Sequence, residues 1–252
     1  MIEVRNLSKS FPGVSVLHDV NVIFREGCCN MIIGKSGSGK TVLLKNLIGL
    51  LKPDGGDIIY DGDSLMAMSV EEMKLLHQKV GVLFQGSALF DFANVIDNVM
   101  FPMNFFTDWS RNRKIERARF CLEKVGVLDA EYKMPSELSG GMQKRVGIAR
   151  AIALNPKYLF CDEPNSGLDP YTSILIDRLI SSLTREFNMT TVINTHDLNS
   201  MLQIGDDISF ISGGTIAWQG GRDNILKTDS EDLVEFICAN TLAKGVMENP
   251  GR

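Results

Sequence analysis

A phosphate-binding loop is the first chemistry that the residues indicate. The segment Gly34-Lys35-Ser36-Gly37-Ser38-Gly39-Lys40-Thr41 matches the pattern G-x-x-x-x-G-K-[ST] at every fixed position, after an apolar run and before a helical pattern that reaches about Leu50. Such glycines let backbone N–H groups face inward around an anion, and the helix N-terminus adds partial positive charge. We therefore expect Lys40 to reach the phosphates of a nucleotide and Thr41 to ligate Mg²⁺. The alternative is a glycine- and serine-rich turn with an exposed lysine.

A pair of acids stands at the end of a later apolar run. The run Tyr158 to Cys161 is followed directly by Asp162 and Glu163, and α/β proteins bind ligands at the carboxyl ends of their strands. Asp162 would hold Mg²⁺, directly or through water, and Glu163 would polarise an attacking water, because phosphoryl transfer depends on positioning and charge stabilisation. A solvated strand end is the alternative.

Two further polar residues follow apolar runs but carry little information alone. Gln85 ends the run that begins at Val80, and His196 follows the run from Thr191 to Asn194. A lone histidine is usually a packed or surface residue, and a single glutamine usually solvates a turn. Their significance depends on the order of the motifs along the chain.

The runs around these residues predict an α/β protein. Short alternating runs near the start, broken by Gly, Asp and Pro, indicate twisted strands at 2–4, 20–24 and 58–60. Compact apolar runs, each followed by a turn and a helical pattern, are typical of buried parallel strands and occur at 30–33, 158–161 and 191–194. From about 90 to 153 no such run occurs, and Arg113 to Val125 has helical spacing, which predicts a helical lobe.

Composition limits the class of protein. The chain has 252 residues, 44% of them hydrophobic, and can bury a sizeable core. A formal net charge of −5 gives no long-range attraction for polyanions, so we expect no nucleic-acid partner. The start lacks a signal-peptide pattern and no long apolar stretch occurs, so the chain is expected to fold in the cytosol. The five cysteines are scattered without metal-ligand spacing, which predicts reduced, mostly buried thiols.

Taken in order, the motifs resemble the complete series of an ABC-transporter ATPase domain. The series is Gly34 to Thr41, Gln85, Leu138-Ser139-Gly140-Gly141-Met142, Asp162-Glu163, Ser166 to Asp169, and His196. The resemblance covers nearly all of residues 1–228, with six motifs in order. It implies a P-loop NTPase fold with a RecA-like core, an N-terminal antiparallel β-subdomain and an inserted helical subdomain at about 90–153. Residues 229–252 would form a C-terminal helical extension and tail.

The resemblance also implies a role for each motif residue. Gln85 would sense the γ-phosphate and couple to the permease, His196 would be the switch histidine, and Phe11 would stack on adenine. For Phe11, a core aromatic at a strand end is the alternative. The catalytic residues would be Lys40, Gln85, Glu163 and His196, and the residues at Mg²⁺ would be Thr41, Gln85 and Asp162. The residues that bind ATP would be Phe11, Gly34, Lys35, Ser36, Gly37, Ser38, Gly39, Lys40, Thr41, Ser139, Gly140, Gly141 and Asp169.

A second copy of the chain is implied by the segment Leu138 to Gly141. Ser139 and the two glycines suit a helix N-terminus that grips a phosphate, and the same helix carries Lys144 and Arg145. In this family that phosphate belongs to ATP bound on the other subunit, so that two ATP molecules lie between two ATPase domains. The resemblance therefore implies a homodimer.

One departure from the common pattern narrows the resemblance. Met142 stands where most members carry glutamine, and this form, with the segments 88–90 and 94–99, resembles the MlaF-type ATPases of Mla lipid-transport systems. That likeness implies an MlaE-like permease dimer and an MCE-domain protein that binds lipid. The chain would lie on the cytoplasmic side of the inner membrane, peripheral through the permease, and would hydrolyse ATP to drive phospholipid transport.

Two apolar segments allow different interpretations. The stretch Phe90 to Phe106 is rich in Phe and Met and would be either the permease dock or the core of the helical lobe. The stretch Asp232 to Leu242 has helical spacing and would either help to pair the ATPase subunits or pack on its own domain. The last residues, 247–252, are expected to form a loose tail.

Three other functions fit parts of the pattern. An importer ATPase for amino acids or other small polar solutes has the same motifs. A non-transport ABC protein would clamp nucleic acid or a ribosome, but the short middle lobe, the single ATPase unit and the negative charge argue against it. A catalytically silent subunit would bind ATP without hydrolysing it, although Lys40, Gln85, Glu163 and His196 are all present.

Overall fold

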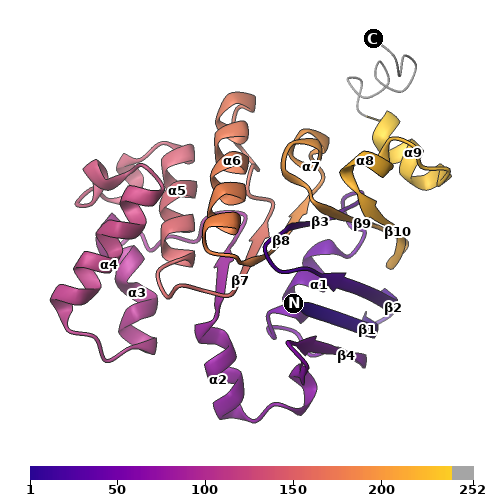
Figure 1. Cartoon of the computed structure of the whole chain (residues 1–252), viewed down its shortest axis with the longest axis horizontal. Coiled ribbons are helices and arrows are strands. Elements are labelled where there is room, and N and C mark those ends of the chain that lie inside the picture. Colours follow the sequence, from indigo (N-terminus) through magenta and orange to yellow (C-terminus); the bar gives the residue numbers. More distant parts are fainter. Residues whose placement is uncertain (240–252) are drawn as a thin grey trace. The chain divides into compact units, whose positions relative to one another are not determined.

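The computed structural model describes residues 1–239, which divide into two compact units (Figure 1). Among the described residues, the first unit contains 1–68 and 192–239, and the second contains Ser69–Thr191. The phosphate-binding loop belongs to the first unit, and the acid pair belongs to the second.

An antiparallel sheet forms the start of the first unit. Its order is β2-β1-β4-β5, with β1 at Ile2–Phe11, β2 at Val14–Phe24, β4 at Gly55–Tyr60 and β5 at Asp63–Ser64. The strands β1 and β2 are longer than the sequence runs predicted. Their added residues are mostly exposed and show no apolar alternation, yet they pair with each other as far as Phe11 and Val14.

The first unit also contains the strands that surround the phosphate-binding loop. The strand β3 (Cys29–Ile33) pairs in parallel with β9 (Asp207–Ser212), which pairs antiparallel with β10 (Thr215–Gly221). The other neighbour of β3 is β8 (Thr190–Thr195), whose residues from Val192 belong to this unit. Every residue of β3 and β8 is buried, as is typical of strands that are covered on both faces. The helical elements of this unit are α1 (Lys40–Leu47), η1 (Leu65–Ala67), α7 (Leu198–Ile204), α8 (Arg222–Ile225) and α9 (Glu231–Cys238).

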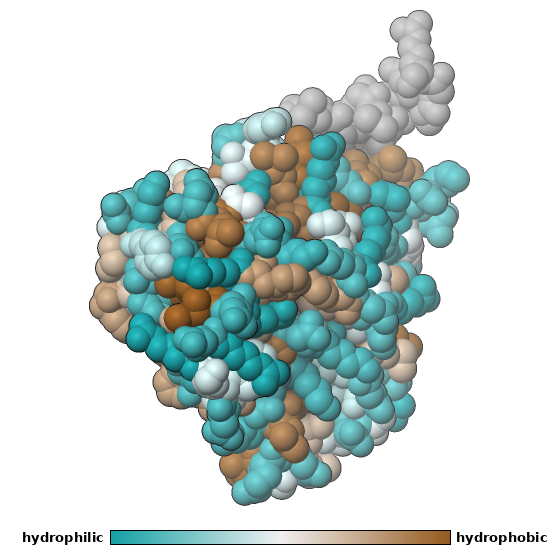
Figure 2. All heavy atoms as spheres, turned by 60° about the vertical axis from the view of Figure 1, so that its left-hand side comes forward, coloured by the Kyte–Doolittle hydropathy of each residue, from teal (hydrophilic) through white to brown (hydrophobic). Residues whose placement is uncertain are grey.

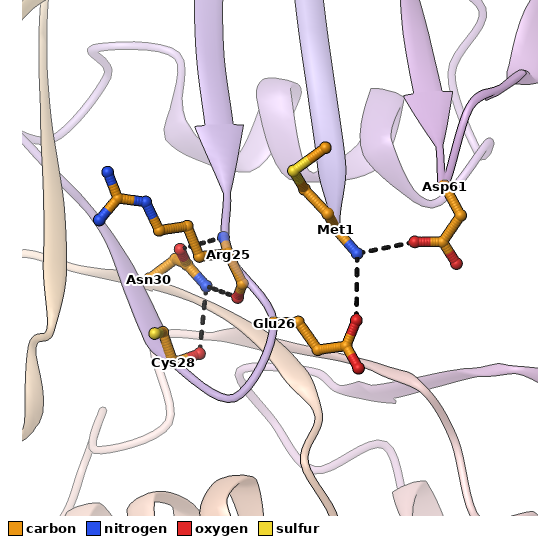
Figure 3. Close-up of polar contacts among 6 residues, drawn as sticks. All are labelled: Met1, Arg25, Glu26, Cys28, Asn30 and Asp61. Atoms are coloured by element: carbon orange, nitrogen blue, oxygen red, sulfur yellow. Dashed lines mark hydrogen bonds and ion pairs between the residues drawn. The ribbon is translucent and has the colours of Figure 1, made fainter.

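Polar contacts fix the turn that enters β3 and the start of β1 (Figure 3). The buried Asn30 accepts from the Arg25 N–H at 2.7 Å and donates to the carbonyl oxygens of Arg25 and Cys28 at 3.0 and 3.1 Å. The N-terminal ammonium lies 2.8 Å from Asp61 Oδ1 and 3.8 Å from Glu26 Oε2. Because Asn30 is a residue of β3 itself, the turn and the strand that leads into the loop are held together.

The second unit consists mostly of helices and contains two strands that lie side by side. The strands β6 (Val80–Leu83) and β7 (Tyr158–Asp162) pair in parallel. Between them lie only helical elements, of which α3, α4 and α5 pack against one another. The helical elements are α2 (Val70–Gln78), α3 (Val95–Phe106), α4 (Arg111–Lys124), η2 (Leu128–Ala130), η3 (Pro135–Glu137), α5 (Gly140–Ala151) and α6 (Pro170–Glu186). The predicted α/β class, with an antiparallel sheet near the start and a helical lobe in the middle, is confirmed.

Two helix predictions differ from the structure at their ends. The helix α1 ends at Leu47 instead of about Leu50, because Gly49 has a φ of +74° and the N–H of Leu50 turns back to the carbonyl of Lys45. The C-terminal helix begins at Glu231, while Leu242 and the tail at 247–252 lie outside the described residues.

The cysteines agree with the prediction of reduced, mostly buried thiols. All five cysteines are free thiols; Cys29, Cys121 and Cys161 are buried, and burial raises the pKa of the Cys121 thiol to about 11. Within residues 1–239, no helix has both the length and the hydrophobicity needed to cross a membrane.

Candidate functional site

The loop 34–41 connects β3 to α1 in the first unit (Figure 1). Gly37 and Gly39 have φ values of +79° and +105°, which L side chains rarely adopt. Lys40 is only 7% exposed, and its ammonium donates to the carbonyl oxygens of Gly34 and Lys35 at 2.9 and 3.1 Å. The positive charge therefore lies against the backbone of the loop and not in open solvent, which excludes the interpretation as a turn with an exposed lysine.

A buried hydroxyl shows that the loop suits an anionic ligand. Within residues 1–239, the Oγ of Ser38 is buried and has no hydrogen-bond partner, which is costly for a polar atom. At Gly34 a Cβ would lie 2.5 Å from the carbonyl oxygen of Ile211 and 2.7 Å from Ser38 Oγ, so only glycine fits there. The hydroxyl, the Lys40 ammonium and the N–H groups at the start of α1 form a donor set that fits the oxygens of a phosphate group.

Phe11 and His196 also belong to the first unit. Phe11 ends β1 with 40% of its surface exposed, and the Nζ of Lys9 lies 5.7 Å from the centre of its ring. This exposure excludes the interpretation of Phe11 as a core aromatic and leaves the ring accessible for stacking. His196 is exposed directly after β8, and the next residue, Asp197, caps α7 by accepting from the N–H of Asn199 at 2.8 Å.

The acid pair ends β7 in the second unit. Asp162 is 9% exposed, so a solvated strand end does not describe it. Glu163 has a φ of +48°, a left-handed conformation that costs a residue with a side chain about 1–3 kcal/mol and is concentrated at functional sites. The chain thus turns sharply at the acid pair.

Gln85 lies in a turn after β6 and forms hydrogen bonds with Ser166 and with a lysine of α5, both in the second unit. Its Nε2 donates to the Oγ of Ser166 at 3.1 Å, and its carbonyl oxygen accepts from the ammonium of Lys144 on α5. Burial lowers the pKa of Lys144, while the neighbouring Cys161, Asp162 and Glu163 raise it. Lys144 therefore connects the turn at Gln85 with the end of β7.

A second cation of α5 holds the same turn. The guanidinium of Arg150 donates to the carbonyl oxygens of Ser87 and Ala88 at 2.5 and 2.7 Å, and burial lowers its pKa. Ser87 and Ala88 have φ values of +59° and +47°, so these bonds stabilise a strained backbone. Lys144 and Arg150 were missed as functional candidates, because only the contacts across about 60 residues of sequence reveal what they hold.

Lys144→Met is expected to lower the rate of phosphate release about tenfold in any assay where the wild type is active. The substitution keeps an apolar stem but leaves the Gln85 carbonyl without its cation, which weakens the position of the turn. Phosphate release and the midpoint of thermal unfolding should be measured together, with Lys133→Met, an exposed lysine of the same lobe, as the control. Equal rates for the two variants would contradict this role of Lys144.

The segment Leu138 to Gly141 leads into the N-terminus of α5, as predicted; Ser139 and Gly140 are exposed, whereas Leu138 is buried. Ser139 caps α5 by accepting from the N–H of Met142 at 3.3 Å. At Gly141 a Cβ would lie 2.7 Å from the Thr172 Cγ2 on α6, so this position requires glycine. Asp169 caps α6 by accepting from the N–H of Thr172 at 3.0 Å and from its hydroxyl at 2.5 Å, which lowers the pKa of the carboxyl. Contact of these residues with a nucleotide stays a prediction.

The predicted metal ligands are divided between the two units. Thr41 belongs to the first unit, whereas Gln85 and Asp162 belong to the second. In the described part of the chain, no group of three or more His, Cys, Asp and Glu residues could hold a metal ion. Mg²⁺ is usually held by one or two carboxylates together with substrate phosphates, and the side-chain oxygens of Thr41, Gln85 and Asp162 are ligands of the kind that it prefers.

Comparison with protein families gives a match over most of the motif series. The family model described as "ABC transporter" matches residues 17–166. This range includes the phosphate-binding loop, Gln85, the segment 138–141 and the acid pair.

Three curated relatives are similar over nearly the whole chain. The "Probable ribonucleotide transport ATP-binding protein mkl" of Mycobacterium tuberculosis is 37% identical over 239 residues, which are 94% of this chain and 66% of that protein. The chain thus spans just under two thirds of the length of that relative. The "Methionine import ATP-binding protein MetN" of Carboxydothermus hydrogenoformans is 39% identical, covering 98% of this chain and 74% of that protein. The "Intermembrane phospholipid transport system ATP-binding protein MlaF" of Haemophilus influenzae is 35% identical, covering 100% and 93%.

Two solved structures share the fold. The dimeric structure of MJ0796, described as a bacterial ABC transporter cassette, has a TM-score of 0.81 and 31% identity, covering 88% of this chain and 99% of that chain. A dimeric post-hydrolysis state of MJ0796, bound to ADP and Pi, also has a TM-score of 0.81, with 30% identity and the same coverage. These similarities confirm the predicted fold class.

Proposed function

Because the chain belongs to the ABC transporter family and carries its ATP-binding domain, we propose that it hydrolyses ATP to drive a permease that moves phospholipid. The loop 34–41 is the observation that carries the nucleotide part of this proposal. It combines a buried ammonium at Lys40, an unsatisfied hydroxyl at Ser38 and a helix N-terminus, which together favour phosphate.

The motif residues take the following roles in the proposed reaction. Lys40 stabilises negative charge on the β- and γ-phosphates, and Glu163 orients the attacking water and accepts its proton. Gln85 and His196 contact the γ-phosphate region, and Phe11 stacks on adenine. Thr41, Gln85 and Asp162 would hold Mg²⁺, which neutralises phosphate charge when it is bound.

The chain acts as a homodimer in this proposal. Ser139, Gly140 and Gly141 form a helix start on the second unit, with Ser139 and Gly140 exposed, and they grip the γ-phosphate of ATP held by the partner copy. The dimeric structures of MJ0796, one of which holds ADP and Pi, support both the dimer and the hydrolysis.

The similarity to MlaF supports phospholipid as the cargo, because it extends over the full chain and 93% of the relative. The proposed partners are an MlaE-like permease dimer and an MCE-domain lipid-binding protein, and the chain lies at the cytoplasmic face of the inner membrane. An importer ATPase for amino acids is the second candidate function. It is favoured by the 39% identity to a methionine import protein over 98% of the chain.

A cluster of four aromatic rings on the second unit, two of them exposed, is the proposed permease dock. Phe90 lies 5.3 Å from Phe92 and 4.3 Å from Phe101, which lies 4.7 Å from Phe105, measured between ring centres. Phe92 is 82% exposed and Phe105 is 66% exposed. Hydrophobic patches interrupt the hydrophilic surface in the view of Figure 2. An apolar segment of the permease would cover these rings.

The two interpretations of the stretch 90–106 therefore apply to different faces of α3. Met100 and Met103 are 7% and 0% exposed and belong to the core of the helical lobe. The exposed rings of the aromatic cluster are available to a partner. The sequence run did not separate these faces, since apolar residues occur on both: Val99 and Met103 are buried, whereas Phe105 is exposed.

The test is recovery of the tagged full-length chain from detergent-solubilised membranes, with identification of bound proteins and lipid. An MlaE-like permease with an MCE protein and phospholipid would support the proposal. A solute permease would keep the ATPase and discard the lipid cargo, whereas a ribosome or nucleic acid would overturn the transport function. Replacing both Phe92 and Phe105 with Asp should abolish permease recovery. Val70→Asp, at a residue that is also 82% exposed, should not.

A further inference from the structure

The C-terminal helix α9 packs on the first unit beside the phosphate-binding loop. Leu233 and Ile237 are 0% and 1% exposed, and the ring of Phe236 lies 5.4 Å from that of Phe210 on β9. The hydroxyl of Ser212, at the end of β9, donates to the Asp232 carboxylate at 2.9 Å. The helix is therefore seated on its own unit, as one of the two sequence interpretations predicted.

The strand β9 also forms one wall of the loop. It pairs in parallel with β3, with Ile33 opposite Phe210, and the backbone of Ile211 closes the space beside Gly34. The same strand thus touches the loop at Gly34 and α9 at Phe210 and Ser212. This arrangement brings the loop and α9 together although about 200 residues separate them in sequence.

An ion pair joins the helix directly to the loop. The Nζ of Lys35, the second residue of the phosphate-binding pattern, lies 2.8 Å from Glu235 Oε1 on α9. The two side chains are 57% and 70% exposed, so the pair contributes little to stability. Its position matters more, because it places a carboxylate on a cation of the loop that is expected to bind phosphate.

We propose that Glu235 lowers the affinity of the loop for nucleotide by holding the ammonium of Lys35. A nucleoside triphosphate competes with this carboxylate for Lys35, and the carboxylate also repels the phosphates because both are negative. Binding is reciprocal, so nucleotide in the loop weakens the attachment of α9 by the same free energy with which α9 weakens nucleotide binding. Glu235 thus acts on nucleotide affinity indirectly, through its ion pair with Lys35. The inference rests on nucleotide binding in the loop 34–41.

The test measures the dissociation constants of a fluorescent ATP analogue and of ADP for the purified full chain at low salt. Glu235→Gln is expected to bind the ATP analogue about two- to fivefold more tightly than the wild type, which is the range for an exposed ion pair. The gain should be smaller for ADP, which carries less charge, and should vanish at about 0.5 M salt. Glu231→Gln is the matched control, since it removes the same charge from the exposed face of α9 one turn earlier.

A double-mutant comparison tests whether the effect passes through Lys35. In a Lys35→Gln background, Glu235→Gln should change the affinity by less than half of its effect in the wild type. Equal affinities for Glu235→Gln and Glu231→Gln, weaker binding by Glu235→Gln, or a gain that persists at high salt would overturn the inference. Absence of nucleotide binding by the wild type would instead overturn the proposed function, which separates the two failures.

Discussion

Glu163→Gln is expected to reduce phosphate release at least about a hundredfold while leaving nucleotide binding intact. The substitution keeps the size of the side chain but removes the carboxylate that would accept a proton from the attacking water, and such groups contribute about 10²- to 10⁴-fold. The variant should also retain the ATP-bound dimer, because closure of the dimer requires binding and not hydrolysis. Phosphate release and size-exclusion chromatography with ATP and Mg²⁺ measure the two effects.

Glu123→Gln, an exposed glutamate on α4, controls for loss of charge in the same unit. Its phosphate release should equal that of the wild type. Full activity of Glu163→Gln would contradict the role assigned to Glu163. A wild type that releases no phosphate, alone or with its permease, would instead identify the chain as a catalytically silent subunit.

The backbone conformation of Glu163 supports a functional role for this residue, in addition to its position in the acid pair. A φ of +48° is unusual for glutamate, and the buried Asp162 precedes it. Glutamine retains the same side-chain shape and tolerates the same backbone about as well. A loss of activity in Glu163→Gln without a change in thermal unfolding therefore reports on chemistry and not on strain.

Local sequence patterns predicted those parts of the site that are formed by residues close together in the chain. The loop 34–41 depends on glycines at fixed spacing between a strand and a helix, and Ser139 caps the helix that follows it. Both features involve neighbours in the chain. Spacing predicted the loop, and the resemblance of the motif together with a capping serine predicted the helix start. The buried strands β3, β7 and β8 were likewise recognisable as compact apolar runs.

Contacts between distant residues could not be predicted in the same way. The bonds from Lys144 and Arg150 to the turn after Gln85 cross about 60 residues, and the pair of Lys35 with Glu235 crosses 200. The sequence also could not predict whether an isolated aromatic side chain is buried or exposed. Phe11 stands alone at the end of a strand whose outer half shows no alternation, so only the fold shows that its ring is open.

Gly34→Ala is the second substitution for which we expect a large effect, a loss of nucleotide affinity of at least about tenfold. The new methyl group would lie 2.5 Å from the Ile211 carbonyl oxygen and 2.9 Å from Ile211 Cγ2. Backbone atoms of β9 cannot yield without moving away from β3, and overpacking of this kind costs about 1–3 kcal/mol. The end of β3 would shift, and with it the carbonyl of Gly34 that accepts from Lys40.

Gly37→Ala in the same loop is the control. It distinguishes a clash with Ile211 from the loss of affinity that any glycine replacement in the phosphate-binding loop would cause. Nothing lies within 4 Å of a Cβ at Gly37, so the substitution carries only the strain of its φ of +79°, about 1 kcal/mol. Nucleotide titration and thermal unfolding of both variants should therefore show a larger loss for Gly34→Ala in each measurement. Equal losses would mean that positive φ, and not the wall formed by Ile211, requires glycine at the start of the loop. A loss of affinity in Gly34→Ala without a change in unfolding would place the shift in the loop alone and leave the pairing of β3 with β9 intact.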